Sequence, residues 1–307
     1  MKKEKKYSGV IIPAVTPLTE SFKLDEGAVE RMFSHFRSQE CLPFILGTTG
    51  EAASLSNSLK KEYIKTAGKL KQSGEMLYAG ISSTCFEESV ELAKFCFDNG
   101  VDAVAANLPS YYILSKSQIK KYFEQLADQC GGPMIIYNIP ATTHMSVPLD
   151  IIDELSHHEN IVATKDSERS IERLQESLKL WRDREDFSHF LGWAAQSAEA
   201  LLNGSDGLIP STGNLHPGIY NYLYKAALSK DEIQAHDYQK LSDELGNLYQ
   251  SGKTLGESLW ALKVLMQQEG LCQEYVMPPL QPQSENDAAL LKQNLYAIME
   301  QEGLKSK

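Results

Sequence analysis

The chain has 307 residues, a formal net charge of −11 at pH 7, 42% apolar residues and 23% charged residues. This composition is ordinary for a soluble globular protein, and the acidic balance argues against nucleic acid and anionic membranes as partners. Cysteines are odd in number and lack metal-ligand spacing, which predicts reduced, mostly buried thiols rather than a disulfide framework or a zinc site. They are Cys41, Cys85, Cys96, Cys130 and Cys272.

The N-terminal segment, residues 1–6, is charged and is not followed by a long apolar stretch. No signal peptide is therefore predicted. No apolar run approaches the ~20 residues needed to cross a bilayer. We expect a cytoplasmic protein that binds neither membrane nor nucleic acid, and a basic start that is a solvated, frayed terminus.

Short apolar runs rich in β-branched residues recur along the chain, and each precedes a stretch with helical periodicity. Their average separation of roughly 28 residues is close to the ~30 residues that a strand–helix–strand unit requires. The eight runs cover residues 10–15, 42–46, 76–81, 103–108, 134–137, 161–164, 189–193 and 207–209.

Amphipathic helices are predicted between these runs. Residues 87–97 and 118–126 are two examples, in which apolar residues recur at helical spacing. Ser117 suits the N-cap of a helix that starts at Gln118, and Pro148 suits the first turn of another helix.

Eight strand–helix units predict a TIM (β/α)8 barrel that occupies residues 1–230, with the active site at the C-terminal ends of its strands. An open, doubly wound sheet is the alternative. No G-x-G-x-x-G motif follows the first strand, which weakens a dinucleotide-binding version of that alternative.

The strand pattern stops near Asp231. Three helices are expected beyond this point, over residues 231–250, 254–269 and 287–300. No low-complexity linker precedes them. We therefore predict a C-terminal helical subdomain, residues 231–307, packed against the barrel.

Lys165 ends a strand-like apolar run and is followed by polar residues. Desolvation at such a position would lower the pKa of the amine and leave a nucleophile for carbonyl carbons. Tyr137 ends the preceding run and could move the protons that imine chemistry requires. Since one strand–helix step separates Tyr137 from Lys165, both should lie on neighbouring strands at one face of the barrel. A solvated or ion-paired lysine is the alternative for Lys165 taken alone.

Residues 47–51, Gly-Thr-Thr-Gly-Glu, follow the second run. The glycines permit a sharp turn, and the hydroxyls of Thr48 and Thr49 with nearby N–H groups could bind a carboxylate. A simple strand-to-helix turn explains the pattern equally well. Glu51 is expected to cap the next helix, where its charge would meet the positive end of the helix dipole.

Two further loops could also reach the site. Tyr111 and Tyr112 follow the fourth run, where paired tyrosines usually pack with their hydroxyls at the surface, a proton relay being the alternative. Residues 207–214 form a Gly/Pro turn whose backbone could contact a small ligand.

His144 lies in the loop after Tyr137 and could touch substrate, although a solvated loop histidine is the simpler expectation. Asp166 and Asp206 are expected to be loop or cap residues rather than metal ligands. No P-loop and no serine nucleophile elbow is present.

Taken together, these segments resemble the dihydrodipicolinate synthase/N-acetylneuraminate lyase superfamily of pyruvate-dependent class I aldolases. The resemblance covers nearly the whole chain and rests on motifs that occur in order at the predicted strand ends. They are GVIIPAVTPL (9–18), GTTGE (47–51), PSYY (109–112), YNIP (137–140), ATKDS (163–167) and GSDGLIPSTGN (204–214).

The resemblance implies a carbon–carbon lyase that acts on pyruvate, or another 2-oxo acid, and an aldehyde. Lys165 would form the Schiff base and Tyr137 would shuttle protons. Thr48 and Thr49 would hold the carboxylate of the keto acid. Thr48 would also link to Tyr137 in a proton relay that includes Tyr111 from a neighbouring subunit.

Gly192 and Ile209 match positions that line the site through their backbone beside the imine. The resemblance implies no metal and no organic cofactor, because the protonated imine is itself the electron sink. It also implies a homo-oligomer, either a dimer or a tetramer, since Tyr111 requires a partner subunit.

Two departures bear on the aldehyde substrate. In the synthase, an arginine after the tyrosine grips the carboxylate of the aldehyde substrate, whereas the matching residue here is Thr142 and the usual glycine two residues later is His144. Without that bidentate donor, dihydrodipicolinate synthase activity is not expected.

In the sialic acid lyases, an Asp-Glu pair after Gly-Tyr binds the hydroxyls of the sugar. Here Ala194 and Ala195 take those positions, and their side chains cannot hydrogen-bond a polyol. Ser167 retains a hydroxyl where the lyases have threonine. Elimination leaves another 2-oxo acid aldol, such as a 2-keto-3-deoxy sugar acid or 4-hydroxy-2-oxoglutarate.

Four alternatives remain from the sequence. Three share the imine chemistry, namely the synthase, the sialic acid lyase and a dehydratase. The fourth is a non-catalytic relative that binds a 2-oxo acid for regulation. Lys165, Tyr137 and Thr48 argue against the fourth, because binding alone needs no nucleophile.

Overall fold

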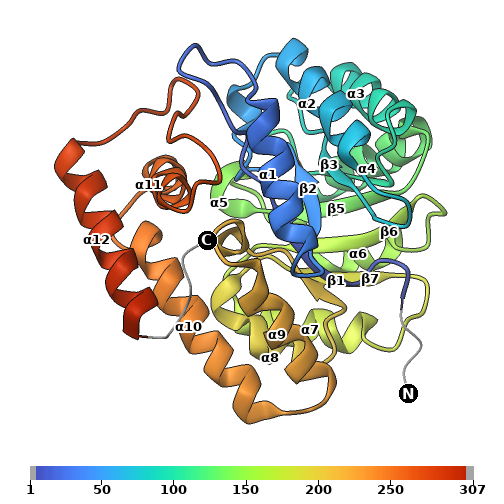
Figure 1. Cartoon of the computed structure of the whole chain (residues 1–307). Coiled ribbons are helices and arrows are strands. Elements are labelled where there is room, and N and C mark those ends of the chain that lie inside the picture. Colours follow the sequence, from blue (N-terminus) through green and yellow to red (C-terminus); the bar gives the residue numbers. More distant parts are fainter. Residues whose placement is uncertain (1–4, 302–307) are drawn as a thin grey trace.

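A closed barrel of eight parallel strands forms the centre of the molecule in a computed structural model that describes residues 5–301 (Figure 1). Each strand pairs with the next, and β8 pairs with β1. This closure confirms the predicted (β/α)8 barrel and excludes the open sheet. The strands are β1 (Gly9–Pro13), β2 (Leu42–Ile45), β3 (Tyr78–Gly80), β4 (Ala103–Ala106), β5 (Met134–Asn138), β6 (Ile161–Asp166), β7 (Ser188–Leu191) and β8 (Gly207–Leu208).

Helices surround the barrel, and short 3₁₀ turns follow β2, β7 and β8. No helix within residues 5–301 is long and apolar enough to span a membrane. The α-helices are α1 (Glu26–Arg37), α2 (Asn57–Leu70), α3 (Phe86–Asp98), α4 (Lys116–Cys130), α5 (Pro140–Thr143), α6 (Leu149–Leu155), α7 (Ile171–Trp181), α8 (Ser197–Leu202), α9 (Pro217–Leu228), α10 (Glu232–Gln250), α11 (Leu255–Gln268) and α12 (Glu285–Gln301). The 3₁₀ turns are η1 (Ala52–Ser54), η2 (Ala194–Gln196) and η3 (Ser211–Asn214).

Apolar side chains fill both faces of the sheet, as a parallel barrel covered by helices requires. One cluster lies between strands and helices, and a smaller one fills the barrel interior. All five cysteines are free thiols, and four of them are buried. The interior cluster contains Tyr7, Ile11, Phe44, Tyr78, Ala103, Ala105, Ile135, Ala163, Phe190 and Ile209.

Helix α4 begins earlier than its sequence pattern indicated. Ser115, not Ser117, is its N-cap, because Ser115 and Gln118 form a capping box in which each side chain accepts from the backbone N–H of the other. Pro148 is the N-cap of α6 rather than a residue of its first turn. Both corrections move a helix boundary by one or two residues.

The expectation of a frayed basic terminus is wrong for Lys5. Its amine donates to Asp206 Oδ2 at 2.8 Å and to the carbonyl of Phe187 at 2.7 Å, and the Lys5 side chain is buried. Asp206 lies in the loop before β8 and also accepts from the backbone N–H of His189. This ion pair therefore closes the N-terminal end of the barrel. Residues 1–4 lie outside the described residues.

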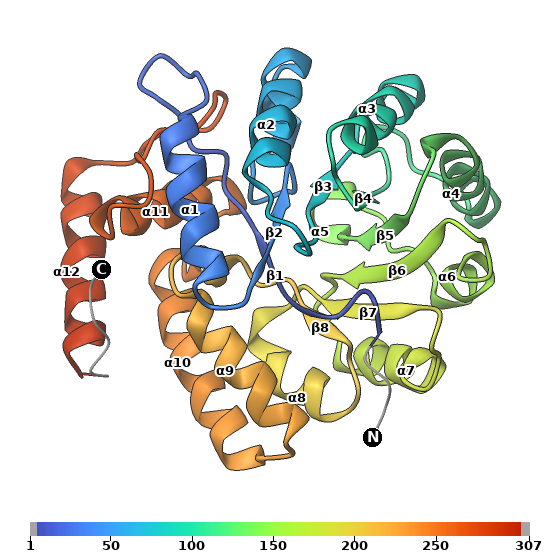
Figure 2. The ribbon, with the colours of Figure 1, turned by 45° about the vertical axis from the view of Figure 1, so that its right-hand side comes forward.

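Helices α10, α11 and α12 gather on one side of the barrel, away from α3 and α4 (Figures 1 and 2). They match the three predicted C-terminal helices to within two residues. Helix α10 packs against α8 and α9, and it also contacts η2 and η3, which follow β7 and β8. The C-terminal helices therefore reach the end of the barrel where the strands finish. The division into two parts at residue 230 stays a prediction.

Candidate active site

Lys165 and Tyr137 are register partners on β6 and β5, as their spacing predicted. Lys165 is 3% exposed. Its Nζ lies 3.9 Å from the centroid of the Tyr137 ring and 5.0 Å from that of Phe44. Two aromatic rings therefore surround an amine that has almost no access to water.

This environment favours a neutral amine. Burial lowers the pKa of Lys165 below its ordinary value of 10.5, and the Tyr137 phenol opposes the shift only in part. The amine of Lys165 therefore gives up its proton more easily than a solvated lysine does. A deprotonated amine has the lone pair needed to attack a carbonyl carbon.

The loop after β2 brings a hydroxyl to the same place. Thr48 Oγ1 and the Tyr137 hydroxyl lie 3.3 Å apart. The next residue, Thr49, is buried. Gly50 turns the loop where a side chain has little room, since an added Cβ would lie 3.0 Å from the carbonyl oxygen of Ala14. The structure thus joins residues from β2, β5 and β6 at one end of the barrel.

Gly192, directly after β7, passes close to Lys165. A Cβ at Gly192 would lie 2.1 Å from Ser167 Oγ and 3.2 Å from Lys165 Cε, so a side chain here would displace the Ser167 hydroxyl. The Gly192 N–H donates to the carbonyl of Asp166 at 2.6 Å. Ile209 is buried in the barrel interior, and its N–H donates to the carbonyl of Leu191 at 2.8 Å. Both candidate lining residues are therefore held by backbone hydrogen bonds.

Tyr111 is not brought to the site within one chain. Among residues 5–301, no hydrogen bond joins it to Thr48 or Tyr137. Tyr111 and Tyr112 are 79% and 73% exposed, and their rings contact each other edge to face. The expectation that this pair packs onto the protein is therefore wrong for the single chain.

The loop after β5 contains the two positions that depart from the synthase pattern. The Thr142 hydroxyl donates to the carbonyl of Ile139 at 3.3 Å, within its own turn. His144 is exposed and adopts a left-handed backbone conformation with φ 57°. The loop thus offers no guanidinium where the synthase has one.

The sequence did not reveal a polar network directly behind Lys165 and Tyr137. Asp166 is the last residue of β6, 4% exposed, and not the loop or cap residue expected. It accepts from Arg173 Nε at 2.6 Å and from Asn138 Nδ2 at 3.1 Å. Asn138 and Asp166 are register partners one step beyond Tyr137 and Lys165, so the same spacing would have found them.

The network ties the β5 loop to β6. Asn138 Oδ1 accepts from the N–H of Val147, and Arg173 donates to the carbonyl of Val147. Glu168 accepts from Asn138 and from the hydroxyl of Ser146. The two strands that carry Tyr137 and Lys165 are thus cross-linked on the side away from the barrel axis.

Glu51 does not cap the following helix, as the sequence suggested. No side-chain cap bond forms at η1, and the Glu51 side chain is fully buried. It pairs instead with Lys263 of α11, Nζ to Oε1, at 2.5 Å. Its other oxygen accepts from the N–H of Met277 at 2.6 Å. The residue that closes the Gly-Thr-Thr-Gly turn is thus bonded to the C-terminal helices.

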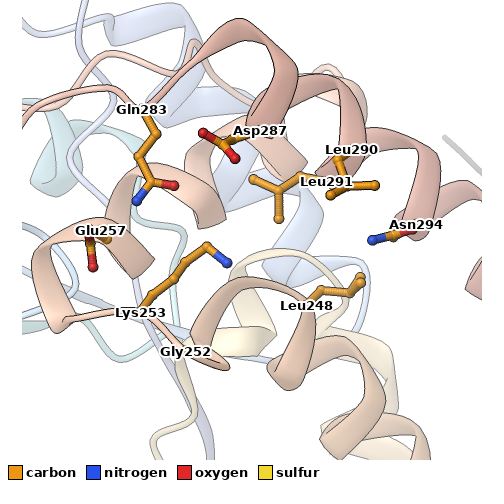
Figure 3. Close-up of a pocket in the computed structure, with 9 residues that line it drawn as sticks. All are labelled: Leu248, Gly252, Lys253, Glu257, Gln283, Asp287, Leu290, Leu291 and Asn294. Carbon is orange, nitrogen blue, oxygen red and sulfur yellow. The ribbon is translucent and has the colours of Figure 1, made fainter.

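A separate pocket of about 260 Å³ lies among α10, α11 and α12 and contains none of these residues (Figure 3). Lys253 points its amine into this space, while Glu257 and Asp287 are engaged in capping α11 and α12. The pocket therefore lacks the groups that surround Lys165. Its lining is Leu248, Gly252, Lys253, Glu257, Gln283, Asp287, Leu290, Leu291 and Asn294.

Comparisons with known proteins agree with this geometry. The model of the dihydrodipicolinate synthetase family matches residues 6–298. An uncharacterised DapA-like lyase of Pyrococcus abyssi is 30% identical over 273 residues, which cover 88% of this chain and 91% of that protein.

Two solved structures share the whole fold. Dihydrodipicolinate synthase from Bacteroides thetaiotaomicron superposes with a TM-score of 0.90 at 28% identity, covering 95% of this chain and 99% of that one. YagE, a prophage protein of the dihydrodipicolinic acid synthase family from E. coli K12, was solved in complex with pyruvate. It superposes with a TM-score of 0.89 at 25% identity, with the same coverage of 95% and 99%. The chain therefore belongs to the dihydrodipicolinate synthetase family and is a carbon–carbon lyase.

Proposed function

We propose that this lyase is a class I aldolase in which Lys165 forms a Schiff base with the keto carbon of pyruvate. The observation that carries the proposal is the buried Lys165 amine, 3.9 Å from the Tyr137 ring, with a lowered pKa. A lysine in a water-poor pocket beside a phenol has the nucleophile and the proton donor that imine formation requires. The pyruvate complex of YagE supports the choice of keto acid.

In the proposed reaction, the Lys165 amine adds to the keto carbon, and the carbinolamine loses water with a proton supplied through Tyr137. In the cleavage direction the imine is that of the aldol. Tyr137 takes the proton of the aldol hydroxyl, the carbon–carbon bond breaks to give the aldehyde, and the protonated imine accepts the electron pair and becomes an enamine. Protonation and hydrolysis of the enamine release pyruvate and free Lys165. The reverse sequence forms the bond. Thr48, 3.3 Å from the Tyr137 hydroxyl, passes the proton on, and Tyr111 of a second copy of the chain completes the relay.

The carboxylate of the keto acid would lie against Thr48 and Thr49 in the loop after β2. Gly192 and Ile209 would line the imine through their backbone, and Ser167 would present its hydroxyl to the substrate. In this proposed arrangement the loop after β2 holds the carboxylate of the keto acid, so that the neighbouring keto carbon lies next to Lys165.

The aldehyde is proposed from what the site lacks. Thr142 stands at the position of the synthase arginine, so this position offers no guanidinium to a second carboxylate, and the Thr142 hydroxyl donates within its own turn. Ala194 and Ala195 carry no hydrogen-bonding side chain toward a polyol. These features argue against dihydrodipicolinate and sialic acid chemistry, and another 2-oxo acid aldol, such as a 2-keto-3-deoxy sugar acid or 4-hydroxy-2-oxoglutarate, is proposed by elimination.

Borohydride trapping tests the Schiff base. The protein is incubated with pyruvate, reduced, digested and mapped by peptide mass spectrometry. A reduced pyruvyl adduct is expected on Lys165 and is expected to disappear in the Lys165→Ala variant. An adduct that persists in that variant, or no adduct in folded wild-type protein, would contradict the proposal.

A further inference from the structure

We propose that Glu51 and Lys263 are positioning residues, which fix the loop that binds the keto-acid carboxylate from the C-terminal helices. The inference deepens the proposed function and rests on it, because it assigns Thr48 and Thr49 to the carboxylate. Neither Glu51 nor Lys263 touches the substrate in this proposal. Both act through the loop, residues 47–51.

The contacts join three distant segments. Lys263 Nζ lies 2.5 Å from Glu51 Oε1 and donates to the carbonyl of Tyr275 at 2.6 Å. Glu51 Oε2 accepts from the N–H of Met277 at 2.6 Å. One carboxylate thus ties the loop after β2 both to α11 and to the segment after it. The side chains of Glu51 and Lys263 are both 0% exposed.

The backbone conformation of Glu51 explains why its bonds to Lys263 and Met277 matter for the turn. Glu51 has φ 57°, in the left-handed region that residues other than glycine seldom adopt. Its N–H donates to the carbonyl of Thr48 at 3.0 Å. A conformation of this kind persists when its surroundings hold it, and here the side-chain bonds to α11 do so. The position of Thr48 therefore depends on Lys263.

The turn has little room to adjust by itself. The hydroxyl of Thr16 donates to the Gly50 carbonyl at 2.6 Å, and a Cβ at Gly50 would lie 3.0 Å from the carbonyl oxygen of Ala14. A buried carboxylate that loses its cation draws toward water, because an unpaired charge is costly in such surroundings. That movement would turn the loop and displace the hydroxyls of Thr48 and Thr49 from the substrate carboxylate.

Trapping at Lys165, measured as a function of pyruvate concentration, tests the role. Lys263→Met removes the cation, and the double variant Glu51→Gln/Lys263→Met keeps the interior neutral in case the single variant fails to fold. Displacement of a positioned group by about 1 Å can lower a rate by as much as ~100-fold. We therefore expect the pyruvate concentration that gives half-maximal trapping to rise roughly 10-fold or more. The adduct should still form on Lys165 at saturating pyruvate.

The Lys5–Asp206 pair is a matched control. It is also buried, at 2.8 Å, but lies at the N-terminal end of the barrel. Lys5→Met/Asp206→Asn should lower stability and leave half-saturating pyruvate unchanged. An equal rise in this control would show a general effect of lost stability and would overturn the positioning role.

The failures of the two proposals are distinguishable. No adduct in wild-type protein would remove the proposed function itself. Only the role of Glu51 and Lys263 is overturned if folded Lys263→Met protein, or the folded double variant where the single variant does not fold, reaches half-maximal trapping on Lys165 at the wild-type pyruvate concentration.

Discussion

At the scale of single residues, the burial that makes the Lys165 amine reactive also lowers the stability of the folded chain. Burial disfavours its charged form, which lowers its pKa in the folded chain, whereas the unfolded chain has the ordinary value of 10.5. Between the two values the unfolded state binds more protons, so stability rises with pH across that window. Below the window the folded state bears the whole cost of a buried ammonium. Lys165, the proposed nucleophile, is therefore a destabilising residue at neutral pH.

Replacing Lys165 by Met should remove this cost. The variant keeps a similar apolar length, and we expect it to lose pyruvate trapping and to unfold at higher denaturant concentration than wild type at pH 7. Its advantage should shrink as the pH approaches 10.5, the ordinary lysine value. Denaturant unfolding at several pH values measures this. A Met variant that is less stable than wild type at every pH would contradict the burial argument.

Tyr137→Phe tests the proton donor. The ring that packs beside the Lys165 amine remains, while the hydroxyl that meets Thr48 is lost. Since general acid–base catalysis contributes ~10²–10⁴-fold, turnover of the aldol substrate should fall by about that factor. The Tyr137→Phe variant should still form the Lys165 adduct, only more slowly. A turnover number close to that of wild type would remove Tyr137 from the acid/base role.

At the scale of elements, the C-terminal helices hold three loops that follow strands of the barrel. Glu51, after β2, meets Lys263 of α11. Gln239 of α10 bridges the loop after β7, accepting from the N–H of Ala198 and donating to the carbonyl of Ala194, both at 2.9 Å.

The third tie is to the loop after β8. The hydroxyl of Tyr249, also on α10, lies 2.7 Å from Ser211 Oγ and 3.0 Å from Thr212 Oγ1. Tyr249 is 2% exposed, so these bonds form in the interior. The helices beyond the barrel thus shape the end of the barrel where Lys165 lies.

Gln239→Leu should show how strongly the β7 loop depends on this bridge. The change leaves the Ala198 N–H without its acceptor in a buried region, at a cost of about 1–3 kcal/mol, whereas the Ala194 carbonyl still accepts from the hydroxyl and the N–H of Ser197. We expect a fall in stability of about 1–3 kcal/mol, measured by denaturant unfolding. Gln239→Glu keeps the acceptor for the Ala198 N–H but places a second carboxylate against Asp243, so it should lose as much stability or more. Equal and negligible losses in both variants would show that the bridge does not hold the loop.

The sequence predicted the elements and the Lys165–Tyr137 pair because period and spacing report on local structure and on neighbouring strands. It did not predict that the Glu51 side chain bonds to Lys263 and Met277 instead of capping the next helix, since both partners lie more than two hundred residues away in the chain. The burial of Lys5 was missed for the same reason, as its partner Asp206 precedes the last strand. Long-range ion pairs leave no periodic signal in a single sequence.

At the scale of the whole molecule, an exposed apolar patch follows β4. Tyr111, Tyr112 and Ile113 are 79%, 73% and 72% exposed, although such side chains usually lie inside or in interfaces. The proposed relay requires Tyr111 from a second copy of the chain. A homo-oligomer would both cover this patch and complete the site.

We expect wild-type protein to sediment as a dimer or tetramer, and Ile113→Glu to sediment as a smaller species with reduced turnover. Ile233→Glu is a suitable control, since Ile233 is 77% exposed on α10, far along the chain from this patch. The control should keep the wild-type mass. An unchanged mass for Ile113→Glu would show that the patch lies outside any subunit interface.

A crystal structure of the protein soaked with pyruvate tests the central claim most directly. We expect continuous electron density from Lys165 Nζ to the second carbon of pyruvate, with the carboxylate against Thr48 and Thr49 and the Tyr137 hydroxyl beside the new bond. Pyruvate bound without a covalent link to Lys165, or bound to a different lysine, would contradict the assignment of Lys165 as the nucleophile.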